Sequence, residues 1–110
     1  MGVPLYQAKA EFFRTLGHPA RIRILELLAE RDHAVHELLE QISIEPSNLS
    51  QQLAVLRRTG LVASQRRGNE VLYSISVPEV RDLLLSARQI LRTIAASRTE
   101  FDDELAPVAR

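Results

Sequence analysis

Apolar side chains recur every three or four residues along the first half of the chain, which is the spacing of one face of an α-helix. The pattern predicts four helices, over Pro4–Leu16, Ala20–Ala29, Val35–Ile42 and Pro46–Gly60. Pro19 suits the first position of the second helix, and Gly60 suits the C-cap of the fourth. The third helix is short and only a tight turn separates it from the fourth, so this pair predicts a helix-turn-helix.

The period of the pattern changes from 3.6 to 2 after Gly60. The stretch "LVASQRRGNEVLYSIS" predicts two antiparallel strands joined by a two-residue turn at Gly68-Asn69. The register that follows pairs Arg67 with Glu70, Arg66 with Val71 and Val62 with Ile75.

A final helix follows the hairpin. Ser76-Val77-Pro78-Glu79 has the S-x-x-E pattern of a capping box and predicts a helix from there to about Ser97. Its apolar residues occupy more than one face: Val80, Leu83, Leu84, Leu85, Ala87, Ile90, Leu91, Ile94 and Ala95. A chain of this length covers one such face itself, so the other predicts a protein partner, most simply a second copy.

Length and composition narrow the class of protein. The 110 residues are 45% hydrophobic and 25% charged, which predicts one mainly α-helical domain over residues 1–98 and an acidic, flexible tail over residues 99–110. No apolar run approaches the roughly 18 residues of a membrane span, and no signal-peptide pattern is present, so we expect a cytoplasmic protein with no membrane contact.

The residue types present also argue against an enzyme. The chain has no cysteine, which excludes disulfides, thiolate metal sites and cysteine catalysis. It also lacks a glycine-rich phosphate loop and a histidine–carboxylate pair within a pocket-forming pattern.

Charge is segregated along the chain although the formal net charge is zero. Acidic residues dominate Glu26–Glu45, whereas Pro46–Ile75 carries four arginines against the single acid Glu70. A local basic face attracts nucleic acid regardless of the total charge.

The order of elements, with a hairpin after the helix-turn-helix, is that of a winged helix. The segments "FFRTLGHPARIRILELL", "SNLSQQLAVLRRTGLV" and "RRGNEVLYSI" resemble the signature segments of the ArsR/SmtB family of bacterial repressors, and the resemblance covers Leu5 to Ala95. It implies a homodimer that binds double-stranded DNA at a palindromic operator and is joined through its first and last helices. The residues that we expect at this dimer interface are Leu5, Phe12, Leu84, Leu91 and Ile94.

The polar residues at the start of the fourth predicted helix are the candidates for contacts with bases. In helix-turn-helix proteins this part of the helix enters the major groove, where Asn and Gln can pair with adenine and Ser with bases or phosphate. The candidates are Ser47, Asn48, Ser50, Gln51 and Gln52, although the family often has histidine at position 52. The alternative is that Ser47 caps the helix and the others are merely solvated.

The arginines are the candidates for contacts with the DNA backbone. Arg66, Arg67 and Asn69 lie in the predicted wing, where Arg67 suits the minor groove or a phosphate. The alternative for Arg67 is a cross-strand ion pair with Glu70. Arg57 and Arg58 end the fourth helix, where they could bind phosphate or simply complement the helix dipole.

An effector site is the least defined part of the prediction. The family resemblance places its usual thiolate ligands on "DHAVHEL", at Ala34 and His36. It places a second site on Val77, Glu79, Ile90 and Thr93, which is absent because only one of these four positions could hold a metal. His33 and His36 with neighbouring carboxylates would suit nickel, zinc or cobalt, but two histidines make only half a site. The alternative is that both are surface histidines, and His18 is predicted to form a hydrogen bond at a helix start.

These observations predict a homodimeric winged-helix transcriptional regulator, with a metal, a small effector or a partner protein as hypotheses for its signal. A winged helix that binds only proteins is the alternative function. In that case the polar face of the fourth helix and the arginines of the wing would be dispensable.

Overall fold

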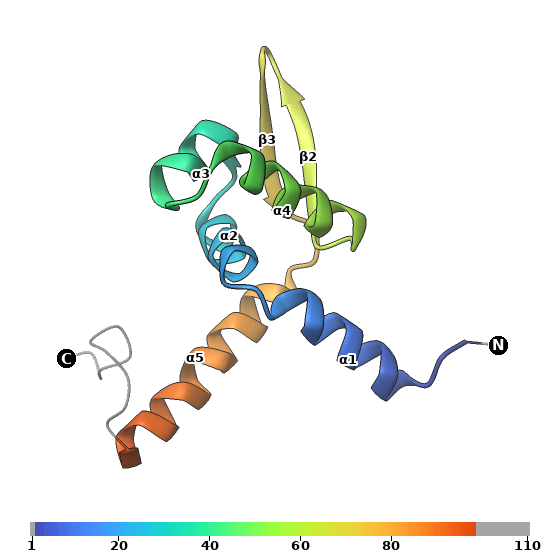
Figure 1. The fold of residues 1–110 in the computed structure, drawn as a ribbon, viewed down its shortest axis with the longest axis vertical. Helices are drawn as coiled ribbons and strands as arrows, with labels where there is room; N and C mark the ends of the chain where they lie inside the picture. The colour runs from blue at the N-terminus through green and yellow to red at the C-terminus, as the bar shows by residue number, and fades with distance from the viewer. Residues whose placement is uncertain (1, 99–110) are drawn as a thin grey trace. The chain divides into compact units, whose positions relative to one another are not determined.

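The computed structural model describes residues 2–98, so the tail predicted over residues 99–110 lies outside the described part of the chain. The elements follow the order α1 (Leu5–Leu16), α2 (Pro19–Glu30), β1 (His33–Ala34), α3 (Val35–Gln41), α4 (Pro46–Arg58), β2 (Val62–Arg67), β3 (Glu70–Ile75) and α5 (Glu79–Arg98) (Figure 1). Two compact units share them: Met1–Val77 holds α1 to α4 and the sheet, and the unit that begins at Pro78 holds α5.

The helices begin and end close to the predicted positions, and the capping residues explain why. The Nδ1 atom of His18 accepts a hydrogen bond from the N–H of Ala20 (3.2 Å), which confirms His18 as a helix-start partner, and Pro19 is the first residue of α2. At the other end of the helix-turn-helix, Thr59 caps α4 and Gly60 follows with φ of +86°, a conformation that favours glycine. The predicted winged helix-turn-helix is confirmed.

The sheet has one strand more than the sequence predicts. Its strand order is β1-β3-β2, and the β2–β3 pairing has the predicted register, including Arg67 opposite Glu70 and Val62 opposite Ile75. The added strand, β1, lies in the segment predicted as a connection and pairs His33 with Tyr73. A two-residue strand is too short to show a period of two in the sequence.

The predicted capping box at Ser76 is wrong. The Ser76 hydroxyl donates a hydrogen bond to the carbonyl of Gly60 (2.7 Å), and the Ser76 N–H donates to the carbonyl of Leu61 (3.1 Å). These bonds tie the end of β3 to the start of β2, and α5 begins only at Glu79. Ser76 therefore closes the hairpin.

The core of the first unit is built from leucine and isoleucine on α2, α3 and α4. Its largest fully buried side chains are Ile24, Leu25, Leu28, Leu38, Leu49, Leu53 and Leu56. The α4 members are the apolar stripe of that helix, so burial of the stripe fixes which face of α4 remains at the surface.

Substitution of Leu38 tests this core. Leu38→Ala should lower the free energy of unfolding by about 2–5 kcal/mol, because the side chain is fully buried and leaves a cavity. Urea unfolding followed by circular dichroism measures the change. Gln41→Ala, at an exposed position of the same helix, should stay within about 0.5 kcal/mol, and an equal loss in both variants would contradict the assignment.

Candidate nucleic-acid interface

Small polar side chains lie on the surface of the first two turns of α4. Ser47, Ser50 and Gln51 are exposed and Asn48 is half-buried. The N-cap of α4 is Glu45, and Pro46 is the first helical residue, so the alternative in which Ser47 caps the helix is wrong. These side chains, with the free N–H groups of the helix start, form a surface of hydrogen-bonding groups.

Gln52 does not belong to that surface, which corrects its prediction as a DNA-contacting residue. Its side chain is 7% exposed and lies among the leucines of the α4 stripe. Its Oε1 atom accepts a hydrogen bond from Nε of Arg21 (2.7 Å), and its Nε2 atom donates to Oδ1 of Asn48 (2.9 Å). A buried amide with both ends bonded is not available to a base.

Arg21 of α2 is a residue that the sequence analysis missed. Besides its bond to Gln52, its guanidinium donates to the carbonyl of Thr15 at the end of α1 (3.1 Å). It therefore links α1, α2 and α4. The feature of the sequence that could have indicated such a residue is Gln52, because a polar residue within an apolar stripe implies a buried partner.

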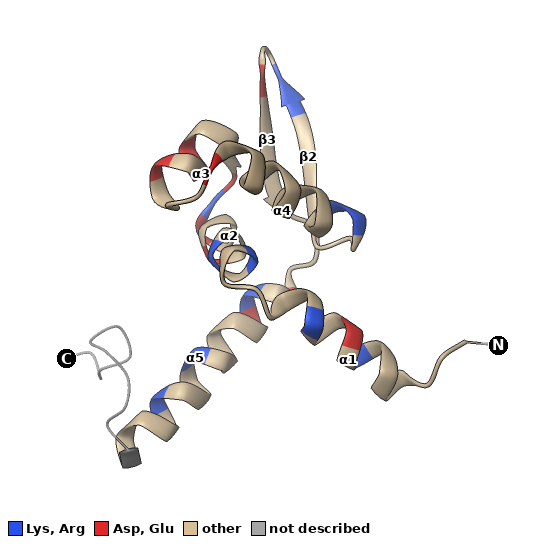
Figure 2. Cartoon of the chain, viewed as in Figure 1, with Lys and Arg blue, Asp and Glu red and all other residues tan. Residues whose placement is uncertain are grey.

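The wing carries its arginines at the far end of the hairpin. Arg66, Arg67 and Asn69 are exposed, and Gly68 turns the chain with φ of +63°. In Figure 1 the hairpin extends beyond the helices of its own unit, and Figure 2 shows basic residues at the end of β2. The basic side chains of the wing are therefore open to solvent at the tip of the hairpin, within the same compact unit as α4.

Arg67 and Glu70 do not form the alternative ion pair in the described part of the chain. The carboxylate of Glu70 lies 3.3 Å from Nε2 of His36 on α3, although Arg67 and Glu70 face each other across the strands. Arg67 thus keeps its guanidinium available for phosphate.

Arg57 and Arg58 occupy the last turn of α4 and are exposed. This position suits the helix dipole and also leaves them accessible to phosphate, so both interpretations remain predictions. Acidic residues gather instead on and around α3 (Figure 2). The charge segregation along the sequence therefore becomes a segregation in space within this unit.

The two candidate metal ligands have different environments. His33 is 3% exposed, and its Nδ1 donates to the carbonyl of Arg31 (2.8 Å). His36 is exposed and bonds Glu70. Within residues 2–98 no group of three or more His, Asp or Glu side chains could hold a metal ion, so the nickel, zinc or cobalt hypothesis stays a prediction without a geometric basis here.

Glu37 explains why the segment between the two histidines begins a helix. Its Oε1 accepts a hydrogen bond from the N–H of Ala34 at the N-cap of α3 (2.9 Å). This bond, together with the nearby Arg31 guanidinium, lowers the pKa of the Glu37 carboxyl from its ordinary value. The carboxylate is therefore a structural group that stabilises α3.

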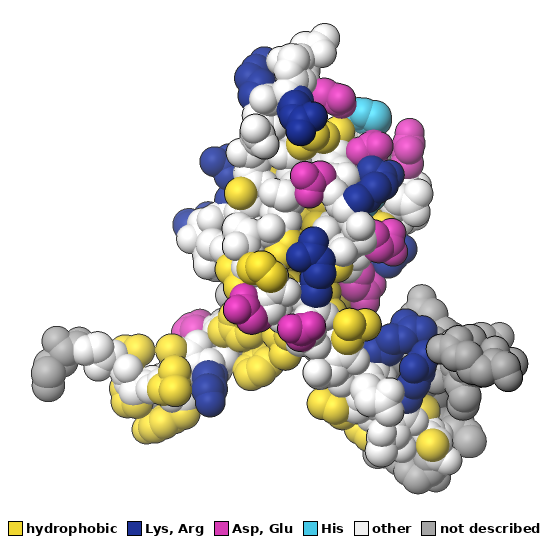
Figure 3. Space-filling model, turned by 180° about the vertical axis from the view of Figure 1, so that it is seen from behind, with side chains coloured by type: hydrophobic (Ala, Val, Ile, Leu, Met, Phe, Trp, Pro, Cys, Tyr) yellow, Lys and Arg dark blue, Asp and Glu magenta, His cyan; other side chains and the backbone are white. Residues whose placement is uncertain are grey.

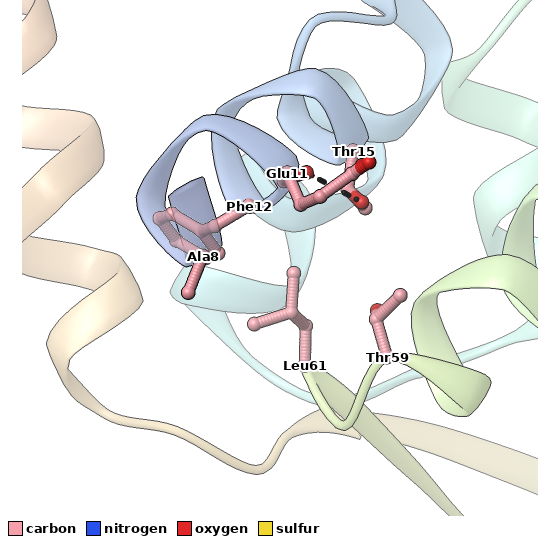
Figure 4. A pocket seen from close by; sticks show the side chains of 6 residues that line it. All are labelled: Ala8, Glu11, Phe12, Thr15, Thr59 and Leu61. Carbon is pink, nitrogen blue, oxygen red and sulfur yellow. Dashed lines mark hydrogen bonds between the residues drawn. The ribbon is translucent and has the colours of Figure 1, made fainter. Parts of the chain in front are cut away.

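A hollow of about 290 Å³ lies between α1 and the turn from α4 to β2 (Figure 4). Its lining combines apolar Ala8, Phe12 and Leu61 with polar Glu11, Thr15 and Thr59. Four of these residues, Ala8, Glu11, Phe12 and Thr15, lie on one face of α1.

Comparison with known proteins identifies the family of this chain. A model of the bacterial regulatory proteins of the arsR family matches residues 18–64, from the start of α2 into β2. The HTH-type transcriptional regulator Rv0081 of Mycobacterium tuberculosis is 55% identical over 103 residues, which cover 93% of this chain and 90% of that protein. The chain belongs to the ArsR family.

Solved structures support the assignment of the chain to the ArsR family. The crystal structure of M. tuberculosis Rv0081 matches with a TM-score of 0.81 and 56% identity, covering 89% of this chain and 99% of that one. The transcriptional repressor BigR from Xylella fastidiosa matches with a TM-score of 0.73 and 33% identity, covering 77% of this chain and 87% of that one.

This ArsR-family protein is a DNA-binding transcriptional regulator and not an enzyme. Nothing in these similarities favours the alternative of a module that binds only proteins. No helix within residues 2–98 is long and apolar enough to span a membrane.

The low pKa of Glu37 predicts a pH-dependent stability. Because the pKa is lower in the folded state than in the unfolded state, the ionised carboxylate stabilises the fold above the unfolded pKa, and this contribution is lost as the pH falls through the folded pKa. Glu37→Gln should therefore be less stable than the parent at pH 7, and the difference should shrink in acid. Urea unfolding between pH 7 and 3 measures it, with Glu40→Gln on the same helix as the control for loss of charge. A difference that does not change with pH would contradict the capping role.

Proposed function

We propose that this ArsR-family regulator binds a palindromic operator as a homodimer, with α4 in the major groove and the wing on the DNA backbone or in the minor groove. One observation carries the assignment of the surface. The exposed polar residues of α4 and the exposed arginines of the wing belong to the same compact unit, while the opposite, apolar face of α4 is buried. Ser47, Ser50 and Gln51 would contact base edges, and Arg66 and Arg67 would neutralise phosphates.

The proposed dimer rests on apolar side chains that a single copy leaves in water. On α1, Leu5 is 70% exposed, and Tyr6 and Phe13 are exposed too. On α5, Leu85 is 65% exposed, and Ile90 and Leu91 are also exposed. Figure 3 shows hydrophobic side chains at the surface of both helices.

The hollow beside Phe12 supports the same proposal. Phe12 is half-buried there, and with Ala8 and Leu61 it would form the apolar part of the lining around a side chain from a second copy. Leu84 and Ile94, also predicted at the interface, are half-buried in the chain described. Repression is the form of regulation that we propose, because the relatives include proteins named as repressors.

The DNA-binding surface is tested by two substitutions with different signatures. Arg67→Ala should weaken binding to all duplexes alike and reduce the slope of log affinity against log salt by about 2, because the homodimer loses one phosphate contact in each half-site. Gln51→Ala should instead cost about 1–3 kcal/mol at one base pair of each half-site and leave the salt slope unchanged. Fluorescence anisotropy with labelled duplex DNA over a range of salt concentrations measures both.

The control for the charge is Arg23→Ala on α2, where the guanidinium pairs with Glu26 at 3.1 Å. This variant should bind DNA as the parent does. Parental binding by both Arg67→Ala and Gln51→Ala would show that the surface has been assigned wrongly.

A substitution on α5 tests the proposed dimer. Leu91→Asp should convert the dimer to monomers in sedimentation velocity and weaken operator binding by at least about tenfold, because two half-sites are no longer held together. Thr93→Asp is the matched control, since residue 93 is exposed and lies two positions from Leu91, and so on the opposite side of the helix from it. A Leu91→Asp protein that remains dimeric, or a parent that is monomeric, would contradict the proposal.

A further inference from the structure

A chain of hydrogen bonds runs from the end of α1 to the exposed face of α4. Arg21 donates to the carbonyl of Thr15 (3.1 Å) and to Oε1 of Gln52 (2.7 Å). Gln52 in turn donates from Nε2 to Oδ1 of Asn48 (2.9 Å). Gln52 is buried, whereas Asn48 is half-buried and lies beside the exposed Ser47 and Gln51. Asn48 is thus the member of the chain that reaches the proposed DNA-binding surface.

The direction of every bond in this chain is fixed by chemistry. A guanidinium has five N–H donors and no acceptor, so the atom of Gln52 that faces Arg21 must be its carbonyl oxygen. The other end of the same planar amide is then Nε2, which can only donate. The atom of Asn48 that it meets must accordingly be Oδ1. An amide at the surface of a protein can rotate to suit either kind of partner, but here Arg21 selects one orientation.

We propose that Arg21 and Gln52 are positioning residues that orient the Asn48 amide, so that Asn48 offers N–H donors to DNA and selects an acceptor edge. This inference rests on the proposed DNA-binding surface. With Oδ1 bonded to Gln52, the Nδ2 group is the side of the amide that Gln52 does not use. In the major groove guanine presents two acceptors, N7 and O6, and cytosine presents the N4 donor. Asn48 therefore favours guanine over cytosine at the position that it contacts.

This assignment differs from the bidentate pairing with adenine that asparagine often makes. That pairing needs Oδ1 to accept from N6 of adenine while Nδ2 donates to N7. Here Oδ1 already accepts from the buried Nε2 of Gln52, so the pairing with adenine would have to use the second lone pair of the same oxygen. Loss of that bond would leave Nε2 of Gln52 unsatisfied in the core, which is costly.

Gln52→Glu reverses the polarity without removing the side chain. The new carboxylate still accepts from Arg21, with added charge assistance, but it cannot donate to Asn48. The Asn48 amide must then rotate so that Nδ2 donates to the carboxylate and Oδ1 faces the DNA. The preference at the contacted position should change from guanine towards bases with an N–H donor, cytosine or adenine, by about tenfold in relative affinity.

The experiment is selection from a library of randomised duplex DNA, with the bound sequences read by sequencing. Four purified proteins are compared: the parent, Gln52→Glu, Asn48→Ala and the double variant Asn48→Ala/Gln52→Glu. Asn48→Ala should lose the preference at one position of each half-site, and the double variant should match Asn48→Ala. Thermal unfolding shows whether each variant folds.

Asn48→Asp provides a second route if Gln52→Glu does not fold. An aspartate accepts from Gln52 and presents only acceptor oxygens, so its preference should also move towards cytosine or adenine. An unchanged guanine preference in the folded Gln52→Glu or Asn48→Asp variant would overturn the inference. So would a change in preference that persists in the double variant, because Asn48 would then not carry it.

The result for the parent distinguishes a failure of this inference from a failure of the proposed DNA-binding surface. Selection of a palindromic sequence by the parent, with no effect of Gln52→Glu, overturns only the orienting role of Arg21 and Gln52. A parent that enriches no sequence would overturn the DNA-binding surface and the orienting role together.

Discussion

The packing of α4, with one face buried against the core, is the constraint on which the rest of the structure depends. Leu49, Leu53 and Leu56 are buried on one face of this helix, and the buried Gln52 among them is bonded to Arg21 of α2. Burial of apolar area supplies most of the free energy, but it is not directional, whereas the hydrogen bonds fix the rotation of the helix about its axis. The exposed polar face follows as a consequence. A helix that rotated by one residue would hide its polar groups and expose its leucines.

The sheet fixes the position of the basic side chains of the wing. The β2–β3 register places Arg66 and Arg67 at the far end of the hairpin, and the bonds from Ser76 to Gly60 and Leu61 close its near end against the turn after α4. One compact unit thus carries both the groups that suit base edges and the charges that suit phosphates. Glu70 bonds His36 and not Arg67, so the basic side chain is not neutralised across the strands.

Periodicity predicted most of this fold because its elements are long enough to show a period. The helices, the hairpin register and the burial of the α4 stripe all followed from spacing. The two-residue strand β1 did not, and neither did the bonds of Ser76, because each depends on residues distant in the sequence. Gln52 shows the same limit within the candidate site. Its sequence position was interpreted as a DNA contact, and only the structure shows that Gln52 is buried, with Arg21 as the partner that makes burial of an amide possible.

The central claim is that the polar start of α4 and the tip of the wing together contact DNA. Amide chemical shifts recorded by NMR during titration of the protein with a selected duplex test it most directly. The account predicts the largest changes over residues 47–51 and 66–69, with small changes on the acidic α3. Changes centred on α3, with 47–51 and 66–69 unaffected, would contradict it.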